Sequence, residues 1–193
     1  MLSKLMSQTR RNHALEHATI HILSEKHKGF SAQGNSTPYG YHLNIYGDIS
    51  EDQVMDAVEE AHRRLRAGES QLGLHPNCGT VLLTTATLAV LATQATLAYE
   101  QRRQRRPKLG GSVWLGALPL AVLTTTLSLI ISRPLGLAVQ DALTVESRLG
   151  DLELAAIRQV PPSPVTRVFQ FLLGQMGNQD VRSYRVDTRF AAD

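Results

Sequence analysis

Two long apolar runs stand out from the mixed hydrophobic and polar pattern of this chain. Residues 80–98 and 113–131 contain no charged side chain. Each run is about 19 residues long, close to the length that a helix needs to cross a bilayer. The segment between them is short, so the pattern predicts a transmembrane helical hairpin. The alternative is a pair of buried or dimerising helices in a soluble protein, which the threonines and Gln94 of the first run favour.

The residues before the first run predict two helices separated by a β-hairpin. A helical pattern covers residues 8–28 and meets Gly29, a typical helix end. Residues 29–47 carry glycines and Pro38, which predicts a hairpin with its second strand at 41–46. Ser50 and Gln53 have the spacing of a capping box. The helix that follows has one apolar stripe, which comprises Val54, Ala57, Val58, Ala61 and Leu65.

The residues after the second run predict a membrane-proximal segment and two strands. Residues 132–145 are expected to lie along the membrane surface, and a short helix is expected to start near Ser163. Residues 151–160 and 182–190 read as strands. An isolated pair of strands is only marginally stable, so we expect these strands to pair with the N-terminal hairpin and form one head domain.

The expected fold class is therefore α+β with a transmembrane helical hairpin. Residues 1–77 form an N-terminal α-ββ-α head domain in this interpretation, and residues 78–132 form the hairpin with a basic loop at 99–111. Residues 133–193 then return to complete the small mixed head.

Charge and cysteine content narrow the functional classes. The chain has a net charge of +3, and residues 99–111 hold five basic residues and one acid. Such a loop suits anionic lipid headgroups, whereas no aromatic reading surface accompanies it, so no nucleic-acid partner is expected. The single cysteine excludes an internal disulfide, and the N-terminus lacks the apolar region of a cleavable signal peptide.

Membrane orientation stays open at this point. The positive-inside rule places the basic loop in the cytoplasm and both termini outside. Three arginines just before the first run favour the opposite orientation, namely Arg63, Arg64 and Arg66.

Candidate chemistry is concentrated in the stretch RNHALEHATIH of the first helix. His13 and His17 lie one turn apart on a helix, with Glu16 beside them. Two imidazoles at this spacing can bind one zinc ion, and a neighbouring carboxylate can accept a proton from water on the metal. An apolar cluster on the opposite face, Leu15, Ala18 and Ile22, leaves the His/Glu face for solvent, a cleft or a metal. The alternative for Glu16 is a solvated residue paired with Arg10 or Arg11.

The motif H-x-x-E-H at residues 13–17 resembles the signature of the inverzincins, the pitrilysin-like zinc peptidases. The resemblance implies zinc on His13 and His17, with Glu16 as general base. The inverzincin third ligand is a glutamate on a distant helix, which here would be Glu59 or Glu60. Neither lies on the apolar stripe of the second predicted helix, and His62 flanks that stripe more closely.

A second source of metal ligands is the segment HPNCG at residues 75–79. His75 and Cys78 are both good zinc ligands, and they lie directly before the first apolar run. Other histidines, at positions 21, 27 and 42, are interpreted as surface residues. The predicted metal ligands are therefore His13, His17, His75, Cys78 and Glu59.

The order of these pieces also resembles an uncharacterised bacterial membrane-protein family. The shared features are the H-x-x-E-H helix, the HPNCGT loop at residues 75–80 and the RPLGL segment at residues 133–137. This resemblance implies architecture but no chemistry.

Two functional hypotheses follow from the motifs. The first is a zinc-dependent hydrolase of the bacterial inner membrane, a metallopeptidase acting on a peptide or membrane-protein substrate near the bilayer. The second is a non-enzymatic membrane scaffold whose His/Glu cluster is structural or binds a metal without turnover. The sequence indicates no oligomeric state.

Overall fold

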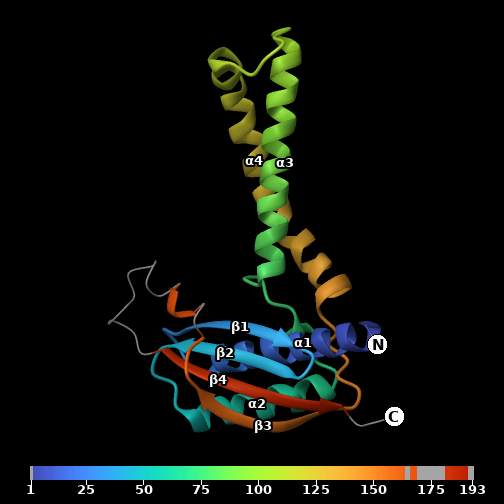
Figure 1. Ribbon diagram of the computed structural model, residues 1–193, viewed down its shortest axis with the longest axis vertical. Helices are drawn as coiled ribbons and strands as arrows, with labels where there is room; N and C mark the ends of the chain where they lie inside the picture. Colours follow the sequence, from blue (N-terminus) through green and yellow to red (C-terminus); the bar gives the residue numbers. More distant parts are fainter. Residues whose placement is uncertain (1, 164–165, 169–180, 191–193) are drawn as a thin grey trace. The chain divides into compact units, whose positions relative to one another are not determined.

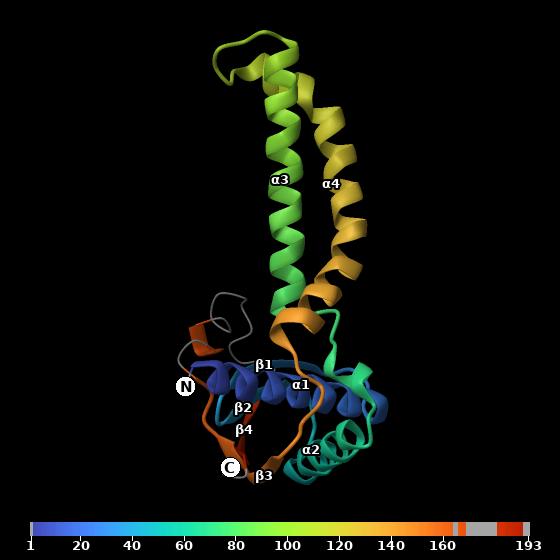
Figure 2. The same ribbon diagram turned by 90° about the vertical axis from the view of Figure 1, so that its right-hand side faces the viewer.

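The computed structural model describes residues 2–163, 166–168 and 181–190. It divides into two compact units. The first, called the head, comprises Met1–Leu74 and Thr144–Asp193, and the second, called the hairpin unit, comprises His75–Leu143. Both units can be followed by colour in Figures 1 and 2.

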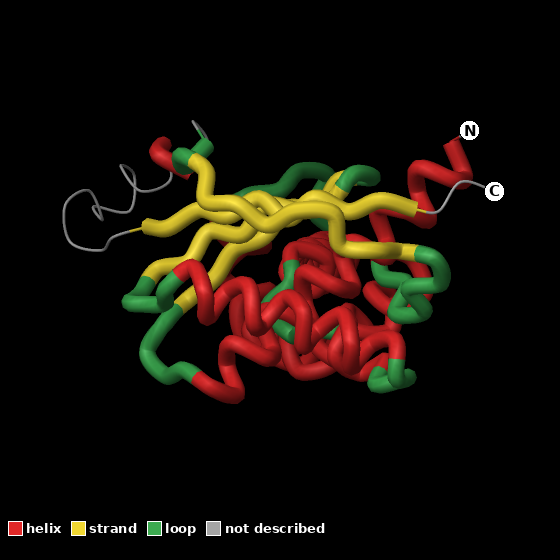
Figure 3. The backbone as a smooth tube through the Cα atoms, turned by 90° about the horizontal axis from the view of Figure 1, so that it is seen from below, coloured by secondary structure: helices red, strands yellow, loops and turns green. Residues whose placement is uncertain are grey.

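The head is an antiparallel sheet with helices packed against it. Its elements are α1 (Leu2–Lys26), β1 (Ser31–Thr37), β2 (Gly40–Tyr46), α2 (Glu51–Arg66), the 3-10 turn η1 (Ser70–Gly73), β3 (Leu152–Val160) and β4 (Val181–Phe190). The strand order is β1-β2-β4-β3, and every neighbouring pair is antiparallel. Since β2 pairs with β4, the expectation of one mixed α+β head built from both ends of the chain is confirmed (Figure 3).

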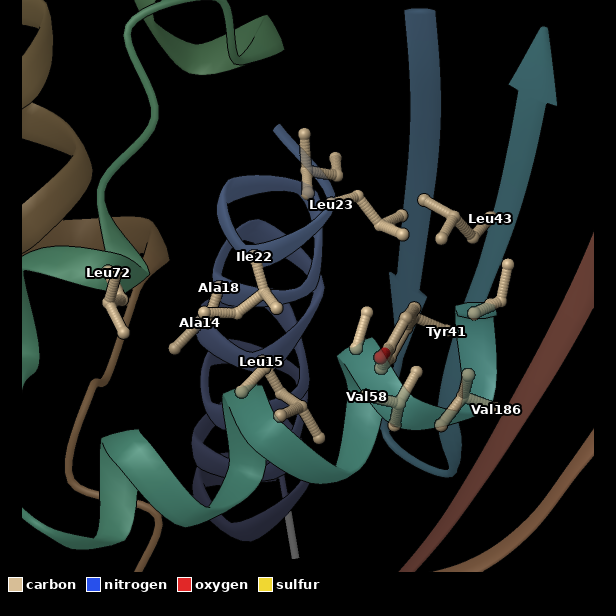
Figure 4. Close-up of a cluster of buried hydrophobic side chains, with 14 of the residues drawn as sticks. Ala14, Leu15, Ala18, Ile22, Leu23, Tyr41, Leu43, Val58, Leu72 and Val186 are labelled. Atoms are coloured by element: carbon tan, nitrogen blue, oxygen red, sulfur yellow. The ribbon is translucent and has the colours of Figure 1, made fainter. Parts of the chain in front are cut away.

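The strand pleat explains which side of the sheet receives the helices. Tyr41, Leu43 and Ile45 alternate along β2 and are fully buried. On β4, Val186 lies opposite Tyr41 and Tyr184 lies opposite Leu43, so all five side chains share one face. Figure 4 shows this face meeting side chains of α1 and α2.

Helix α2 follows its sequence prediction closely. Ser50 accepts a hydrogen bond from the Gln53 backbone, and the Gln53 side chain accepts one from the Ser50 backbone, which completes the capping box. The buried residues are the predicted stripe, Val54, Ala57, Val58, Ala61 and Leu65. A local cap and one apolar stripe were therefore sufficient to define this helix.

Helix α1 differs from its prediction in two respects. It begins at Leu2 rather than near residue 8. Both of its faces are covered in the middle, since Leu15 is fully buried while Glu16 and His17 are only 4% and 2% exposed. The alternative in which Glu16 is a solvated residue is therefore wrong. Arg11 pairs instead with Glu146 and Asp151 of the returning chain.

The C-terminal strand predictions are confirmed, and one neighbouring expectation changes. The short helix expected after Ser163 lies largely outside the described residues. The segment after residue 132 continues as helix to Val139 instead of forming a separate surface segment. This continued helix packs closely on its neighbour, since a Cβ on Gly136 would lie 3.0 Å from the Val81 Cα.

The hairpin unit consists of α3 (Gly79–Arg103), α4 (Gly111–Val139) and most of the π-helical turn η2 (Gln140–Thr144). Hydroxyl pairs join the two helices in antiparallel order: Thr85 with Ser132, Thr93 with Thr125 and Thr96 with Thr124. Such small polar contacts are typical of helices that pack closely in a bilayer.

Both helices are long and apolar enough to cross a membrane. Only 11% of the residues in each apolar window are buried, so the pair does not form a core with the rest of the described chain. Large apolar side chains such as Leu83, Leu115 and Ile130 point outward instead.

Candidate metal centre

Three histidines form a row along α1, and each contacts a backbone carbonyl. His13 Nδ1 lies 2.9 Å from the Thr144 oxygen, and His17 Nδ1 lies 2.7 Å from the Gly73 oxygen. His21 makes a similar contact through its other nitrogen, since its Nε2 lies 2.8 Å from the Leu74 oxygen. These carbonyls belong to the two places where the head chain leaves for, and returns from, the hairpin unit.

The carbonyl partners fix which ring nitrogen carries the proton. A carbonyl oxygen can only accept a hydrogen bond, so the contacting nitrogen must donate. In neutral His13 and His17 the lone pair is therefore on Nε2. This is the arrangement seen in metal-binding histidines, where a hydrogen bond from one nitrogen orients the ring and the other nitrogen binds the ion. His21 has the opposite arrangement, which separates it from the pair.

The His13 and His17 rings are close enough to share one ion. Their centroids are 4.3 Å apart with an interplanar angle of 58°. One ring nitrogen of each lies within 4.8 Å of the other. Tetrahedral zinc would hold two such nitrogens about 3.3–3.4 Å apart, given bonds of about 2.0–2.1 Å. Small side-chain rotations would close this gap, so the donor pair fits a zinc ion.

The absence of a side chain at Gly73 in η1 allows the Gly73 carbonyl to reach His17. A Cβ on Gly73 would lie 2.3 Å from Ser147 Oγ and 3.3 Å from the Ala14 Cβ. No other residue type fits this gap without displacing its neighbours, so the missing side chain lets the Gly73 carbonyl approach α1. The Thr144 carbonyl, which contacts His13, is positioned by contacts of the residues that follow it. Glu146 accepts hydrogen bonds from Ser7 and Arg11, which fixes the chain just after Thr144.

Glu16 lies in a different row of α1, together with Asn12 and Thr19. The Asn12 side chain donates to the Thr37 carbonyl and accepts from the Thr188 hydroxyl, both in the sheet. Ser36 Oγ of β1 donates to Glu16 Oε2 over 2.6 Å. The carboxyl group also occupies the space beside Gly34, where a Cβ would lie 2.0 Å from Glu16 Oε1. The carboxyl group is therefore held by strand β1.

The polar row continues to a buried tyrosine. Thr19 Oγ1 and the Tyr41 hydroxyl are 2.7 Å apart, and both residues are fully buried. Burial raises the pKa of Tyr41 well above its ordinary value, and the nearby charge of Glu16 raises it further. The phenol is thus neutral at physiological pH and joins Asn12 and Glu16 in connecting α1 to the sheet.

The structure does not bring Glu59 to the His13–His17 pair among the described residues. Glu59 is exposed on α2, and Glu60 pairs with Arg63. His62 Nε2 contacts the Leu152 carbonyl of β3 instead, at 2.9 Å.

The remaining predicted ligands belong to the hairpin unit. His75 Nδ1 accepts a hydrogen bond from the Asn77 backbone over 3.3 Å, and the Gln140 side chain bonds both backbone groups of His75. Cys78 is the N-cap residue of α3. Their roles as metal ligands stay predictions.

Sequence reasoning missed the residues that position the centre, because they lie far along the chain. Nothing near the motif indicated that Thr144 would contact His13 or that Ser36 would contact Glu16. The glycines at positions 34 and 73 were the available signals, since glycine often marks a close approach of backbone to another group.

Comparison with known proteins places the chain in a family. A domain of unknown function, DUF6391, matches residues 8–157, more than half of the chain. The chain belongs to the DUF6391 family. The resemblance to an uncharacterised bacterial family is thereby confirmed, and the DUF6391 match includes the His/Glu helix, the segment at 75–80 and both apolar helices.

One relative of this DUF6391 chain is an uncharacterised protein of Picosynechococcus sp.. It is 39% identical over 93 residues, which cover 42% of this chain and 44% of the relative. The match thus spans less than half the length of that relative. No solved structure matches the chain.

Proposed function

We propose that this chain is a membrane-anchored zinc protein that catalyses the hydrolysis of peptide bonds at the membrane surface. The carrying observation is the anchored imidazole pair: His13 and His17 each donate through Nδ1 to a carbonyl, which places the lone pair of each neutral ring on Nε2. Zinc suits this pair because nitrogen and sulfur donors are its preferred ligands.

The third ligand is proposed to be Cys78, with His75 as the alternative. Leu74 is the last residue of the first stretch of the head, and its carbonyl contacts His21. Four residues reach at most about 14 Å, so Cys78 can lie no farther than that from Leu74. A thiolate is a strong zinc ligand, and the N-terminus of α3 favours negative charge at this position.

Three protein ligands leave a fourth position for water, which is the ligand count of catalytic zinc sites. When bound, zinc would supply a Lewis acid that makes this water nucleophilic near neutral pH. Glu16 is the proposed general base, since it precedes His17 on the same helix. To act, its carboxyl group would have to leave or share the hydrogen bond from Ser36.

The second candidate function is metal binding without turnover. It is favoured by the Glu16 environment, because a carboxyl group that is 4% exposed and bonded to Ser36 is suited to holding α1 on β1. The protein would then be a scaffold in the membrane.

The hairpin unit is proposed to be the anchor, in the bacterial inner membrane. Its helices have 25 and 29 residues. At about 1.5 Å per residue they are longer than the roughly 30 Å of a hydrocarbon core. Their outward apolar side chains would face lipid.

The test combines zinc content and cleavage in the full chain purified in detergent. Zinc is measured in the wild type, His13→Ala and His17→Ala, with the exposed His42→Gln as the matched control. We expect one zinc per chain in the wild type and control, and a loss in the other two. A wild type without stoichiometric zinc would end the proposal.

Cleavage of fluorescently labelled casein then separates the two candidates. Glu16→Gln should retain zinc and lose at least about 100-fold in rate, the usual contribution of a general base. Zinc binding in the wild type with no cleavage supports the scaffold instead. Equal cleavage by the wild type and Glu16→Gln rejects Glu16 as the base.

A further inference from the structure

The turn between α3 and α4 carries a concentrated positive charge. Residues 102–108, called the basic turn, contain five cationic side chains and no acid. Arg103 is neutralised by Glu100, which accepts two hydrogen bonds from it at 2.7 Å. The other four cations are exposed, and none of them takes part in an ion pair within the described part of the chain: Arg102, Arg105, Arg106 and Lys108.

The basic turn is a built structure rather than a loose connection. Gln104 Nε2 donates to Glu100 Oε1 and to the Ser112 carbonyl, which joins the end of α3 to the start of α4. Gln101 and Arg106 exchange two further hydrogen bonds, at 3.1 and 3.2 Å. Arg105 has a left-handed backbone with φ of 51°. The four unpaired cations are therefore presented by a closed turn.

Apolar and aromatic side chains flank these cations. Tyr99 is 57% exposed near the end of α3, and Trp114 is 54% exposed near the start of α4. Leu109 is exposed beside Lys108. Aromatic residues next to cations at the end of an apolar helix are typical of the interface between hydrocarbon and headgroups.

We propose that the basic turn binds the phosphate groups of anionic phospholipids. The proposal rests on the membrane anchoring proposed above, since the helices would place the turn at headgroup depth. Guanidinium groups donate paired hydrogen bonds to phosphate oxygens, and each cation near an anionic surface strengthens binding. Nucleic acid is the less suitable phosphate source, because the flanking aromatic residues adjoin apolar helices instead of a folded reading surface.

The only tryptophan of the chain makes this binding measurable without a label. Trp114 lies beside the basic turn, so its fluorescence reports nearby lipid. The full chain is reconstituted in phosphatidylcholine vesicles that contain a minor fraction of phosphatidylglycerol. Either the phosphatidylglycerol or an equal amount of the phosphatidylcholine carries brominated acyl chains, which quench tryptophan on contact.

The measured quantity is the ratio of Trp114 quenching by brominated phosphatidylglycerol to quenching by an equal amount of brominated phosphatidylcholine. We expect a ratio of about five or more, which is the enrichment that one cation gives at an anionic surface. High salt should reduce this ratio. Arg102→Gln, Arg105→Gln, Arg106→Gln and Lys108→Gln combined should bring it near one, since the remaining cation of the basic turn, Arg103, is paired with Glu100. The matched control combines Arg63→Gln with Arg66→Gln, two exposed arginines of α2, and should keep the ratio of the wild type.

The possible failures are distinguishable. Equal quenching by both lipids overturns the lipid assignment and leaves the membrane anchor intact. Absence of quenching by either lipid overturns the anchor itself, and with it this inference. A short RNA is the last comparison. If it binds the wild type but not the quadruple variant, and if it abolishes the lipid preference, the turn would be assigned to nucleic acid instead.

Discussion

Replacing Gly34 with alanine tests whether β1 holds the Glu16 carboxyl group. The new Cβ would lie 2.0 Å from Glu16 Oε1 and 2.1 Å from Glu16 Cδ, so the carboxyl group must move. Moving it breaks the 2.6 Å hydrogen bond from Ser36. A hydrogen bond to a charged group contributes about 1.5–3 kcal/mol. Overpacking adds about 1–3 kcal/mol, and the smaller chain entropy of alanine returns up to about 1 kcal/mol.

The expected net loss is therefore about 1.5–5.5 kcal/mol in the free energy of unfolding. For a chain of this size each kcal/mol lowers the melting temperature by about 2–4 °C. Thermal unfolding of the full chain in detergent, followed by circular dichroism, measures the loss. Gly111→Ala is the control, since a Cβ there meets nothing within 4 Å.

A double-mutant cycle makes this prediction specific. In a Glu16→Ala background the Gly34→Ala change should cost less than about 0.5 kcal/mol, since the displaced atoms are gone. An equal cost in both backgrounds would show that the strain lies elsewhere in β1. A wild-type melting temperature for Gly34→Ala alone would show that β1 does not hold the Glu16 carboxyl group in place.

Three further predictions concern other contacts. Gly73→Ala should displace the carbonyl that orients His17, because the new Cβ would lie 2.3 Å from Ser147 Oγ. We expect zinc to bind at least about 10-fold more weakly, as measured by competition with a chelator. Since burial raises the pKa of Tyr41, the folded state keeps a proton that the unfolded state loses, so stability should fall as pH rises above about 10. Urea unfolding at a series of pH values should show this slope in the wild type and a smaller one in Tyr41→Phe. Gly136→Val should separate α4 from Val81 and lower hairpin stability by about 1–3 kcal/mol, measured by thermal unfolding in detergent.

The elements with local signals were predictable from the sequence. The capping box at Ser50 and the turn after Pro38 are encoded within a few residues, and both appear as expected. The apolar lengths of α3 and α4 are also local properties. Local chemistry was therefore sufficient for most of the fold.

The centre required information that no local pattern contains. His13 and His17 were recognised by their spacing, but their carbonyl partners lie 131 and 56 residues away. Glu16 lies in the row of Asn12 and Thr19, next to the histidine row, and its carboxyl group accepts a hydrogen bond from Ser36 of β1. Helical periodicity alone cannot decide whether the Glu16 carboxyl group faces the histidines or strand β1. Its direction depends on the hydrogen bond from Ser36 and on the space beside Gly34.

X-ray absorption at the zinc edge of the purified full chain tests the central claim most directly. The account predicts zinc with two nitrogen neighbours at about 2.0–2.1 Å from His13 and His17, and one sulfur neighbour at about 2.3 Å from Cys78. Cys78→Ser should remove the sulfur signal and leave the nitrogen signals. Zinc surrounded only by oxygen, or a spectrum unchanged in His13→Ala and His17→Ala, would contradict the account.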